Sequence, residues 1–243
     1  MLSLTRGRYS ARIACDGGDL AAAQALRDLS FRAGSGSDAD AFDPSCDHVL
    51  VWDDRTDQLV CCFRLLPLSD GRDISQSYSA QYYELSALAD FDAPMVEMGR
   101  FCIHPEVKDP DILRVAWGAM TQYVDEHGVE LLFGCSSFHG TDADSYHDAF
   151  AMLAARHLAP KRWLPKVKAP QVFRFADRKR RPADPRRAMR GMPPLLKSYL
   201  AMGGWVSDHA VVDPDLNTLH VFTGLEIAAI PAARKRLLRA VAG

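Results

Sequence analysis

The sequence predicts an α/β domain in which helices cover a mixed β-sheet. Segments with the apolar spacing of helices alternate along the chain with short apolar runs typical of strands. The 243 residues are enough for one sizeable core or two small ones. Hydrophobic residues make up 48% of the chain and charged residues 25%, as in ordinary globular proteins. We therefore expect one layered domain over residues 1–243.

The first part of the chain is expected to hold a helix followed by a β-hairpin. Residues 17–30 have helical spacing, with Asp19 as the expected N-cap. Residues 33–43 are rich in Gly, Ser and Asp, which indicates a mobile loop. Residues 48–53 and 59–66 are two apolar runs joined by a polar turn, and this pattern predicts the hairpin.

The middle of the chain alternates between helices and strands. Residues 79–88 are expected to be helical and residues 95–103 to form a strand. Residues 111–127 predict a helix, with proline before its start and glycine after its end. A short buried strand over 131–137 and a helix over 144–157 complete this part.

The last third begins with a proline-rich basic segment at residues 160–194, which we expect to be extended or looped. Residues 195–202 predict a short helix that stops at two glycines. Residues 206–212 and 218–225 predict a closing pair of strands, and residues 231–241 a small basic amphipathic helix.

Positive charge is concentrated in one region of a chain whose net charge is only −2. Residues 156–190 contain 13 Lys and Arg against two Asp, a net charge of +11. Such a segment can dock an acidic partner or lie against anionic lipid, and a solvated arm is the alternative. The basic tail at residues 228–243 fits binding at a membrane interface in the same way.

The cysteines and the N-terminus indicate a cytoplasmic protein. The six cysteines form no C-x-x-C pair, and four lie in apolar runs, so we expect reduced thiols. The N-terminus lacks the apolar core of a secretory signal. No run approaches the roughly 18–20 apolar residues that cross a bilayer. Any membrane contact is expected to be peripheral, at the inner face of the cytoplasmic membrane.

Charged residues occur within or beside the predicted strands, at Asp43, Asp47, Arg64, Glu97 and Arg100. Strict alternation would place Glu97 and Arg100 on opposite faces of their strand. Charges in apolar surroundings are costly unless they are paired or used. Buried ion pairs that only fix the core and a functional site both remain open at this point.

This residue series resembles two related acyltransferase families. The acyl-homoserine-lactone synthases share the order of Arg27-x-x-x-Phe31, Asp43 and Asp47, Arg64-Leu-Leu-Pro, and Glu97-x-x-Arg100-Phe101. The ornithine N-acyltransferases of ornithine-lipid synthesis are more similar and span most of the chain. The matching runs are FDPSCDHVLV, CFRLLP, YELS, VEMGRFCIHP, LLFGCSSFHGTD and PPLLKSYL…DPDLNTLHVF. The aromatic residue usual in lactone synthases is missing from residues 32–41.

The resemblance implies a GNAT-like fold, with a central mixed, mostly antiparallel sheet flanked by helices. The strand at 95–103 would then receive the pantetheine arm of the acyl donor. Gly99 would permit close backbone approach, and Ile103, His104 and Asp111 would line the arm. Acidic residues near Asp111 oppose a phosphate there, and a glycine-rich pyrophosphate loop is missing. This favours an acyl-carrier protein over free coenzyme A.

The resemblance also assigns roles at the reacting centre. Glu97 is the expected general base for the amine, with its pKa raised by burial. Backbone N–H groups near Phe101 and Cys102 would stabilise the tetrahedral oxyanion, beside Arg100. Direct attack by the amine needs no acyl-enzyme, and Cys102 is more simply a buried thiol.

The implied acceptor is ornithine. Asp43 and Asp47 would hold its two ammonium groups, and Arg64 or Arg100 its carboxylate. Arg27, Phe31, Ser136 and Ser137 complete the expected substrate site by their place in the matching runs.

The predicted reaction moves a (3-hydroxy)fatty acyl group from a phosphopantetheine thioester on acyl-carrier protein to the α-amino group of ornithine, giving lyso-ornithine lipid. No permanently bound cofactor, metal site or nucleic-acid partner is expected. Two alternatives remain: a lactone-type signal synthase that uses S-adenosylmethionine, and a carrier- or lipid-binding protein without turnover. The H-x-x-x-x-D pattern of glycerolipid acyltransferases occurs at His104 and His139, without the flanking sequence of that family.

Overall fold

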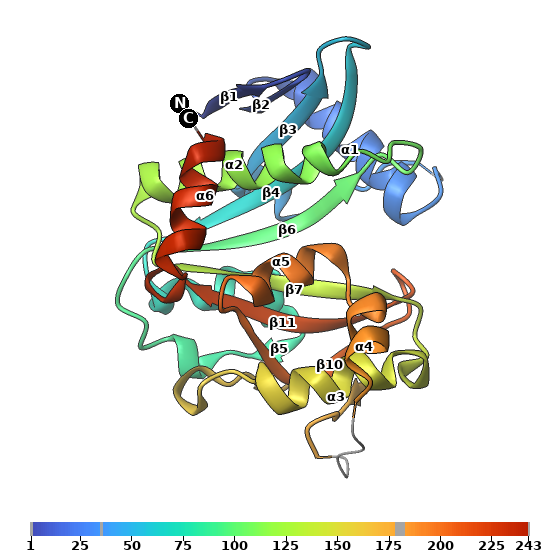
Figure 1. Cartoon of the computed structure of the whole chain (residues 1–243), viewed down its shortest axis with the longest axis vertical. Helices are drawn as coiled ribbons and strands as arrows, with labels where there is room; N and C mark the ends of the chain where they lie inside the picture. Colours follow the sequence, from blue (N-terminus) through green and yellow to red (C-terminus); the bar gives the residue numbers. More distant parts are fainter. Residues whose placement is uncertain (1, 35, 178–182, 243) are drawn as a thin grey trace. The chain divides into compact units, whose positions relative to one another are not determined.

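Contacts within the chain divide it into two units. Figure 1 shows the whole chain, coloured along the sequence. Unit 1 consists of Met1–Pro67, Met98–Val129 and Pro231–Gly243, and unit 2 of Leu68–Glu97 and Glu130–Ile230. The computed structural model describes residues 2–34, 36–177 and 183–242. The expectation of a single domain over the whole chain stays a prediction.

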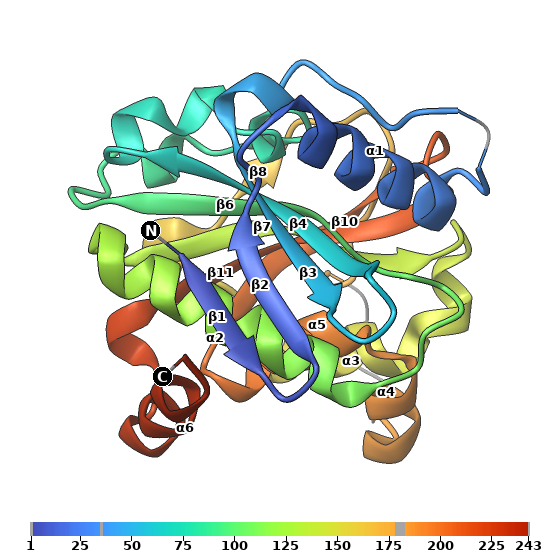
Figure 2. The same cartoon turned by 90° about the horizontal axis from the view of Figure 1, so that it is seen from above.

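Unit 1 is built on strands that pair in the order β1-β2-β3-β4-β6. Helix α2 packs against the first three of these strands, and α6 packs along α2 (Figures 1 and 2). Its elements are β1 (Ser3–Arg6), β2 (Tyr9–Ile13), α1 (Gly17–Phe31), β3 (Asp47–Asp53), β4 (Gln58–Leu68), the second part of β6 (Met95–Ile103), α2 (Pro110–His127) and α6 (Ala232–Ala242).

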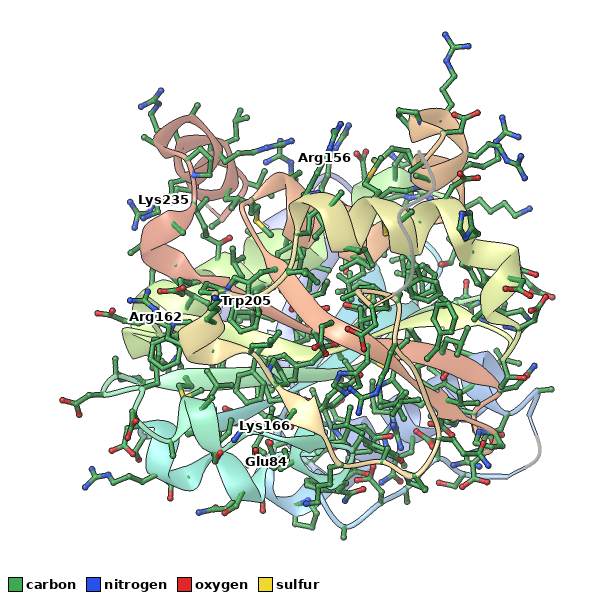
Figure 3. All side chains as sticks on the ribbon, turned by 90° about the horizontal axis from the view of Figure 1, so that it is seen from below. Glu84, Arg156, Arg162, Lys166, Trp205 and Lys235 are labelled. Carbon is green, nitrogen blue, oxygen red and sulfur yellow. The ribbon has the colours of Figure 1, made fainter. Side chains whose placement is uncertain are left out.

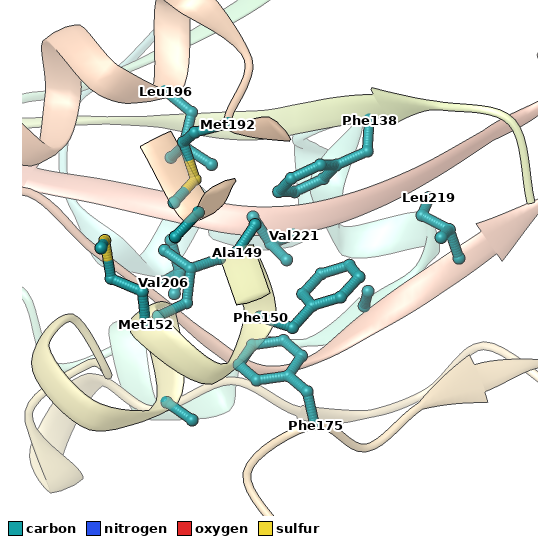
Figure 4. Close-up of a cluster of buried hydrophobic side chains, with 14 residues drawn as sticks. Phe138, Ala149, Phe150, Met152, Phe175, Met192, Leu196, Val206, Leu219 and Val221 are labelled. Atoms are coloured by element: carbon teal, nitrogen blue, oxygen red, sulfur yellow. The ribbon is translucent and has the colours of Figure 1, made fainter. Parts of the chain in front are cut away.

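Unit 2 continues from the first part of β6, with strand order β6-β7-β11-β10-β9. Helix α3 covers an apolar cluster in which Phe138, Phe150 and Phe175 meet side chains of the sheet (Figure 4). Its other elements are β5 (Tyr83–Glu84), β7 (Leu131–His139), α3 (His147–Arg156), β8 (Lys166–Val167), β9 (Val172–Phe173), α4 (Pro185–Gly191), α5 (Pro194–Ala201), β10 (Trp205–Asp213) and β11 (Thr218–Glu226).

The strand pairing is mixed and mostly antiparallel, as predicted. β6 and β7 run parallel, with Glu97 opposite Phe133. The pairs β1/β2, β2/β3, β3/β4, β7/β11, β10/β11 and β9/β10 are antiparallel. The predicted helix over 111–127 and the closing strands are confirmed to within two residues at each end.

Residues 79–88 do not form the predicted α-helix. They form two short 3₁₀ turns on either side of β5. Tyr83 is buried at 1% exposure, and β5 pairs with β8 from a distant part of the chain. Pairing between distant segments here overrides the local helical spacing, because tertiary context outweighs propensity.

Three smaller features differ from what the sequence predicts. The hairpin of β1 and β2, in which Leu4, Tyr9 and Ala11 are buried, was not expected. The N-cap of α1 is Asp16, whose side chain accepts a hydrogen bond from the Asp19 backbone. The basic segment 160–194 is not only extended, because it contains α4; residues 178–182 of that segment lie outside the described residues.

Among the described residues, no helix combines the length and the apolar character needed to cross a membrane.

Candidate functional site

Glu97 lies in β6 of unit 2 and is held by a short loop. Its Oε2 accepts the Tyr78 backbone N–H at 2.7 Å, and its Oε1 accepts the Ser79 N–H at 2.7 Å and the Ser79 hydroxyl at 2.5 Å. The side chain is 4% exposed. Hydrogen bonds donated to a carboxylate stabilise its ionised form. This clamp therefore keeps Glu97 able to accept a proton.

The loop that holds Glu97 is supported by the basic segment. Lys168 donates to the carbonyl oxygen of Ala80 at 2.6 Å, and the Ala169 N–H donates to the carbonyl oxygen of Tyr82 at 2.9 Å. Where β5 meets β8, Lys166 lies 3.6 Å from Glu84 (Figure 3). This part of the basic segment is folded against its own unit rather than free as an arm.

The two predicted serines of β7 point to different surroundings. Ser136 is buried and accepts a hydrogen bond from Thr223 at 2.9 Å. Ser137 is exposed. Cys135, which precedes Ser136 in β7, is half-buried, and its Sγ lies 3.4 Å from the Ser79 hydroxyl.

Unit 1 gathers most of the other predicted charges into one ion-pair network. Its members alternate in sign, and four of them are at most 4% exposed. The closest N–O pairs are Arg27–Asp38 at 2.9 Å, Arg27–Asp43 at 2.7 Å, Arg32–Asp38 at 3.1 Å, Arg64–Asp40 at 2.5 Å, Arg64–Asp43 at 2.6 Å, Arg100–Asp38 at 2.9 Å and Arg100–Asp40 at 3.1 Å.

The arginines determine the charge state of this network. Burial alone would raise the pKa of Asp43, but hydrogen bonds from Arg27 and Gln24 hold it well below its usual range. The pKa of Asp38 is likewise lowered against burial by Arg100 and Arg27. Burial would lower the pKa of Arg64, yet its hydrogen bond to Asp40 raises it. Every carboxylate here stays ionised at neutral pH.

The network carries an excess positive charge and an open donor. Four arginines meet three aspartates in it. Nη2 of Arg27 is buried and finds no hydrogen-bond partner among the described residues. Buried donors in native proteins are usually satisfied, so this one suits a bound anion.

Asp38 and Asp40 join three of the predicted arginines, although neither aspartate was predicted as a site residue. They lie in the Gly/Ser/Asp-rich segment that was expected to be mobile, and Asp38 is 2% exposed. The sequence did offer a signal for them: Asp38 and Asp40 are two acidic residues one position apart, in a chain whose strands carry arginines that need acidic partners.

The contacts found for Asp47 and Phe31 are not ion pairs of this network. Asp47 is half-buried at the start of β3 and accepts a hydrogen bond from Tyr123 of α2 at 2.8 Å. Burial first, and then this bond, raise the pKa of Tyr123. Phe31 packs against an apolar cluster that includes Leu26 and Cys102.

Arg100 has an unusual backbone conformation for a residue inside a strand. Its φ of +52° lies in the left-handed region, which costs a side chain about 1–3 kcal/mol. The regular alternation expected along this strand is therefore interrupted at Arg100. The guanidinium reaches both Asp38 and Asp40 from this position. Strain of this kind tends to be kept at functional sites.

The neighbours of Arg100 are packed into unit 1. Phe101 stacks on Phe63, with ring centroids 5.6 Å apart. Cys102 is 5% exposed, and its Sγ lies 3.5 Å from Cys62 Sγ. A hydrogen bond from Cys62 lowers the pKa of Cys102. A Cβ built on Gly99 would lie 3.5 Å from Arg64 Nε, an ordinary contact distance.

The end of β6 and the start of α2 are fixed by hydrogen bonds. Ile103 is half-buried, and the backbone N–H of His104 donates to Val60 of β4 at 2.8 Å. Asp109 caps α2 by accepting the Asp111 N–H at 2.9 Å. Asp111 itself pairs with Arg114. A carboxylate thus already occupies the position where a phosphate would approach this helix.

One further acidic group in the described residues has ligand atoms close enough for a metal ion. Cys15, Asp16 and Asp19 place one such atom each within 4.8 Å of one another. Asp19 is bound by Arg12 at 2.7 Å, and Asp16 caps α1. The cap and the arginine account for this cluster.

Comparisons with known proteins agree with this fold. The family described as acetyltransferase (GNAT) domain matches residues 26–118. The solved structure of an N-acyl amino acid synthase from uncultured soil microbes superposes with a TM-score of 0.53. It covers 91% of this chain and 93% of that one at 12% identity. The fold is that of the GNAT acyltransferases.

Two curated relatives match over most of their length. The L-ornithine N(alpha)-acyltransferase of Rhodobacter capsulatus is 33% identical over 238 residues, which cover 91% of each chain. The L-ornithine N(alpha)-acyltransferase of Brucella abortus is 30% identical over 233 residues, which cover 86% of this chain and 82% of that one. The chain is an N-acyltransferase and belongs to the family of the L-ornithine Nα-acyltransferases.

Proposed function

We propose that this protein transfers a (3-hydroxy)fatty acyl group from acyl-carrier protein to the α-amino group of L-ornithine, giving lyso-ornithine lipid. The observation that carries the proposal is the 33% identity over 91% of a relative named for this acceptor and reaction. The amine attacks the thioester carbonyl directly, and the pantetheine thiol leaves.

Glu97 is the proposed base. An α-ammonium group must lose a proton before it attacks a thioester. The three hydrogen bonds from Tyr78 and Ser79 favour the ionised carboxylate, which is the form that accepts this proton directly or through water. Replacing Glu97 by Gln should lower kcat by about 10²-fold or more, because general base catalysis contributes 10²–10⁴-fold. The thermal transition should persist, and wild-type turnover in the variant would refute the assignment.

The unit 1 network is the proposed acceptor site. Its excess positive charge and the open Nη2 of Arg27 favour the ornithine carboxylate, with Arg64 and Arg100 beside it. Asp43 and Asp47 are proposed for the two ammonium groups. Asp43 already accepts from Arg27, Arg64 and Gln24, so a bound ammonium would replace one of these donors. Substrate binding then exchanges one ion pair for another.

The proposed donor is a carrier-protein thioester rather than free coenzyme A. Asp109 already caps α2, and its negative charge opposes a phosphate at that helix end. The basic residues of segment 160–194 and of α6 are complementary to an acidic carrier. Oxyanion stabilisation is assigned to backbone N–H groups near Phe101 and Cys102, beside the strained Arg100.

A product assay tests the whole proposal. Purified protein is incubated with 3-hydroxyacyl carrier protein and single amino acids, and the products are identified by mass. N-acylornithine should form, and acyl-coenzyme A should be a poorer donor than the carrier thioester. Formation of an acyl-lactone with S-adenosylmethionine, or no product from any amino acid, would overturn the proposal.

A further inference from the structure

Three side chains of unit 2 form a continuous hydrogen-bonded line. Glu97 Oε1 lies 2.5 Å from the Ser79 hydroxyl, which lies 3.4 Å from the Cys135 thiol. Ser79 is fully buried and Glu97 is 4% exposed, whereas Cys135 is half-buried. The more accessible end of the line is therefore the thiol.

The chemistry of the groups sets the direction of both hydrogen bonds. An ionised carboxylate only accepts hydrogen bonds, and a serine hydroxyl has a single proton to donate. Ser79 donates that proton to Glu97. Its oxygen then accepts from Cys135, so the thiol is protonated while Glu97 is ionised.

Acyl transfer from a thioester to an amine needs a proton at each end. Glu97 first takes the extra proton of the α-ammonium group and releases it to water. The nitrogen of the neutral amine then forms a bond to the carbonyl carbon and loses a second proton, while the carbon–sulfur bond breaks and the departing sulfur gains one. A base alone serves only the nitrogen. The line from Glu97 through Ser79 to Cys135 holds an ionised base at one end and a protonated thiol at the other. The amine needs the base and the departing sulfur needs the acid.

We propose that Cys135 protonates the departing pantetheine sulfur and that Ser79 couples it to Glu97. This step rests on the proposed function, in which Glu97 takes the proton from the amine. After transfer, Glu97 is a carboxylic acid and Cys135 is a thiolate. Glu97 then donates to Ser79, Ser79 donates to Cys135, and both groups return to their starting states. The second amine proton is thereby replaced on the sulfur, and the first, that of the ammonium, has gone to water.

The direction of this return follows from ordinary acidities. A free thiol has a pKa of about 8.5 and a free glutamate carboxyl about 4.3, so a proton moves readily from the acid to the thiolate. Cys135 and the pantetheine thiol are the same kind of acid, and proton transfer between matched groups is efficient. Ser79 touches neither substrate in this scheme and is a positioning residue.

The test compares two small acyl donors that differ in their need for a proton. The 3-hydroxyacyl thioester of N-acetylcysteamine releases an alkyl thiolate, which needs an acid. The same acyl thioester of thiophenol releases a stabilised thiolate, which does not. Rates of N-acylornithine formation are measured for wild type and variants with both donors, at concentrations where wild type uses both, and are divided by the concentration of folded enzyme.

The proposal predicts a donor-dependent loss. Cys135→Ala and Ser79→Ala should lower kcat about 100-fold with the alkyl donor and less than about threefold with the aryl donor, with KM little changed. Glu97→Gln should be slow with both donors, because it removes the base for the amine. Ser79→Thr restores a hydroxyl and should recover much of the lost rate.

Ser77→Ala is the matched control. Ser77 is as buried as Ser79 in the same loop, but its hydroxyl donates to the carbonyl oxygen of Ile74. Loss of the Ser77 hydroxyl should change the rates of N-acylornithine formation with the alkyl and the aryl donor by the same factor. Folded Cys135→Ala with the wild-type rate on the alkyl donor, or with equal losses on both donors, would overturn the relay. A wild-type protein that makes no N-acylornithine from 3-hydroxyacyl carrier protein would instead overturn the proposed function.

Discussion

Replacing Asp38 by Asn tests whether the unit 1 network is held by buried charge. Asp38 is 2% exposed, and its carboxylate pairs with Arg27, Arg32 and Arg100. Removing one partner of a buried ion pair costs about 3–5 kcal/mol, because it leaves an uncompensated charge. Asparagine keeps one acceptor oxygen, so we expect the free energy of unfolding to fall by about 3 kcal/mol, the lower end of this range. In a chain of this length 1 kcal/mol shifts Tm by roughly 2–4 °C, which predicts a fall of about 6–12 °C.

Asp125→Asn is the matched control for this prediction. Asp125 makes two hydrogen bonds to Arg239, each 3.0 Å long, but both side chains are largely exposed. Exposed pairs contribute about 0–1 kcal/mol, so Tm should fall by no more than about 4 °C. Thermal unfolding of the two variants is followed by circular dichroism in the same buffer. If Tm falls by the same amount in Asp38→Asn and Asp125→Asn, burial is not what determines how much the unit 1 network stabilises the fold.

Three further predictions concern acid stability, the donor path and the C-terminal helix. The folded-state pKa values of Asp38, Asp40 and Asp43 lie below the unfolded value of about 3.9. These carboxylates therefore add to the free energy of unfolding at pH values above about 3.9, and this stabilisation is lost as the pH falls through their folded-state pKa values. The urea midpoint should hold from pH 7 to about pH 5 on their account and drop below about pH 4; a midpoint unchanged at pH 3 would contradict this. Gly99→Ala should leave Tm within about 2 °C, since its Cβ finds ordinary contacts, yet should raise the KM for the acyl donor if pantetheine passes there; an unchanged KM would remove Gly99 from the donor path. Reversing the exposed Arg234 and Arg236 to Glu should weaken binding to anionic vesicles, measured by pelleting, by roughly 30-fold or more, because each basic residue contributes about 1 kcal/mol to that binding. The control is the same double reversal at the exposed Arg55 and Arg114. Equal losses of binding in the two variants would exclude α6 as the binding face.

Point substitutions are a better test of α6 than its removal. Leu238 and Val241 of α6 are half-buried, and a Cβ built on Gly118 of α2 would lie 2.9 Å from Val241. Leu237 of the same helix is 61% exposed. Deleting the tail would uncover α2 and confuse loss of folding with loss of binding. The charge reversals change only the outward face.

Local sequence was sufficient where structure depends on neighbours along the chain. Proline at the start of α2 and Gly128 at its end, with φ of +60°, fix that helix. Apolar runs fixed β3, β4, β6 and β7 to within two residues. A charge within an apolar strand needs a partner, because burying it alone is costly. This reasoning identified Arg64, Glu97 and Arg100 before their partners were known.

The partners themselves were decided by tertiary structure. Arg100 meets Asp38 across 62 positions in sequence, and Glu97 meets Ser79 across 18. Residues 79–88 have helical spacing, yet β8 draws them into a strand pair. The left-handed φ of Arg100 likewise follows from contacts that no local pattern encodes. The sequence by itself identified the charges set into apolar strands and the family of the chain, but not the buried Asp38. Only the folded chain decided which of them touch, because those contacts join segments that propensity treats as independent.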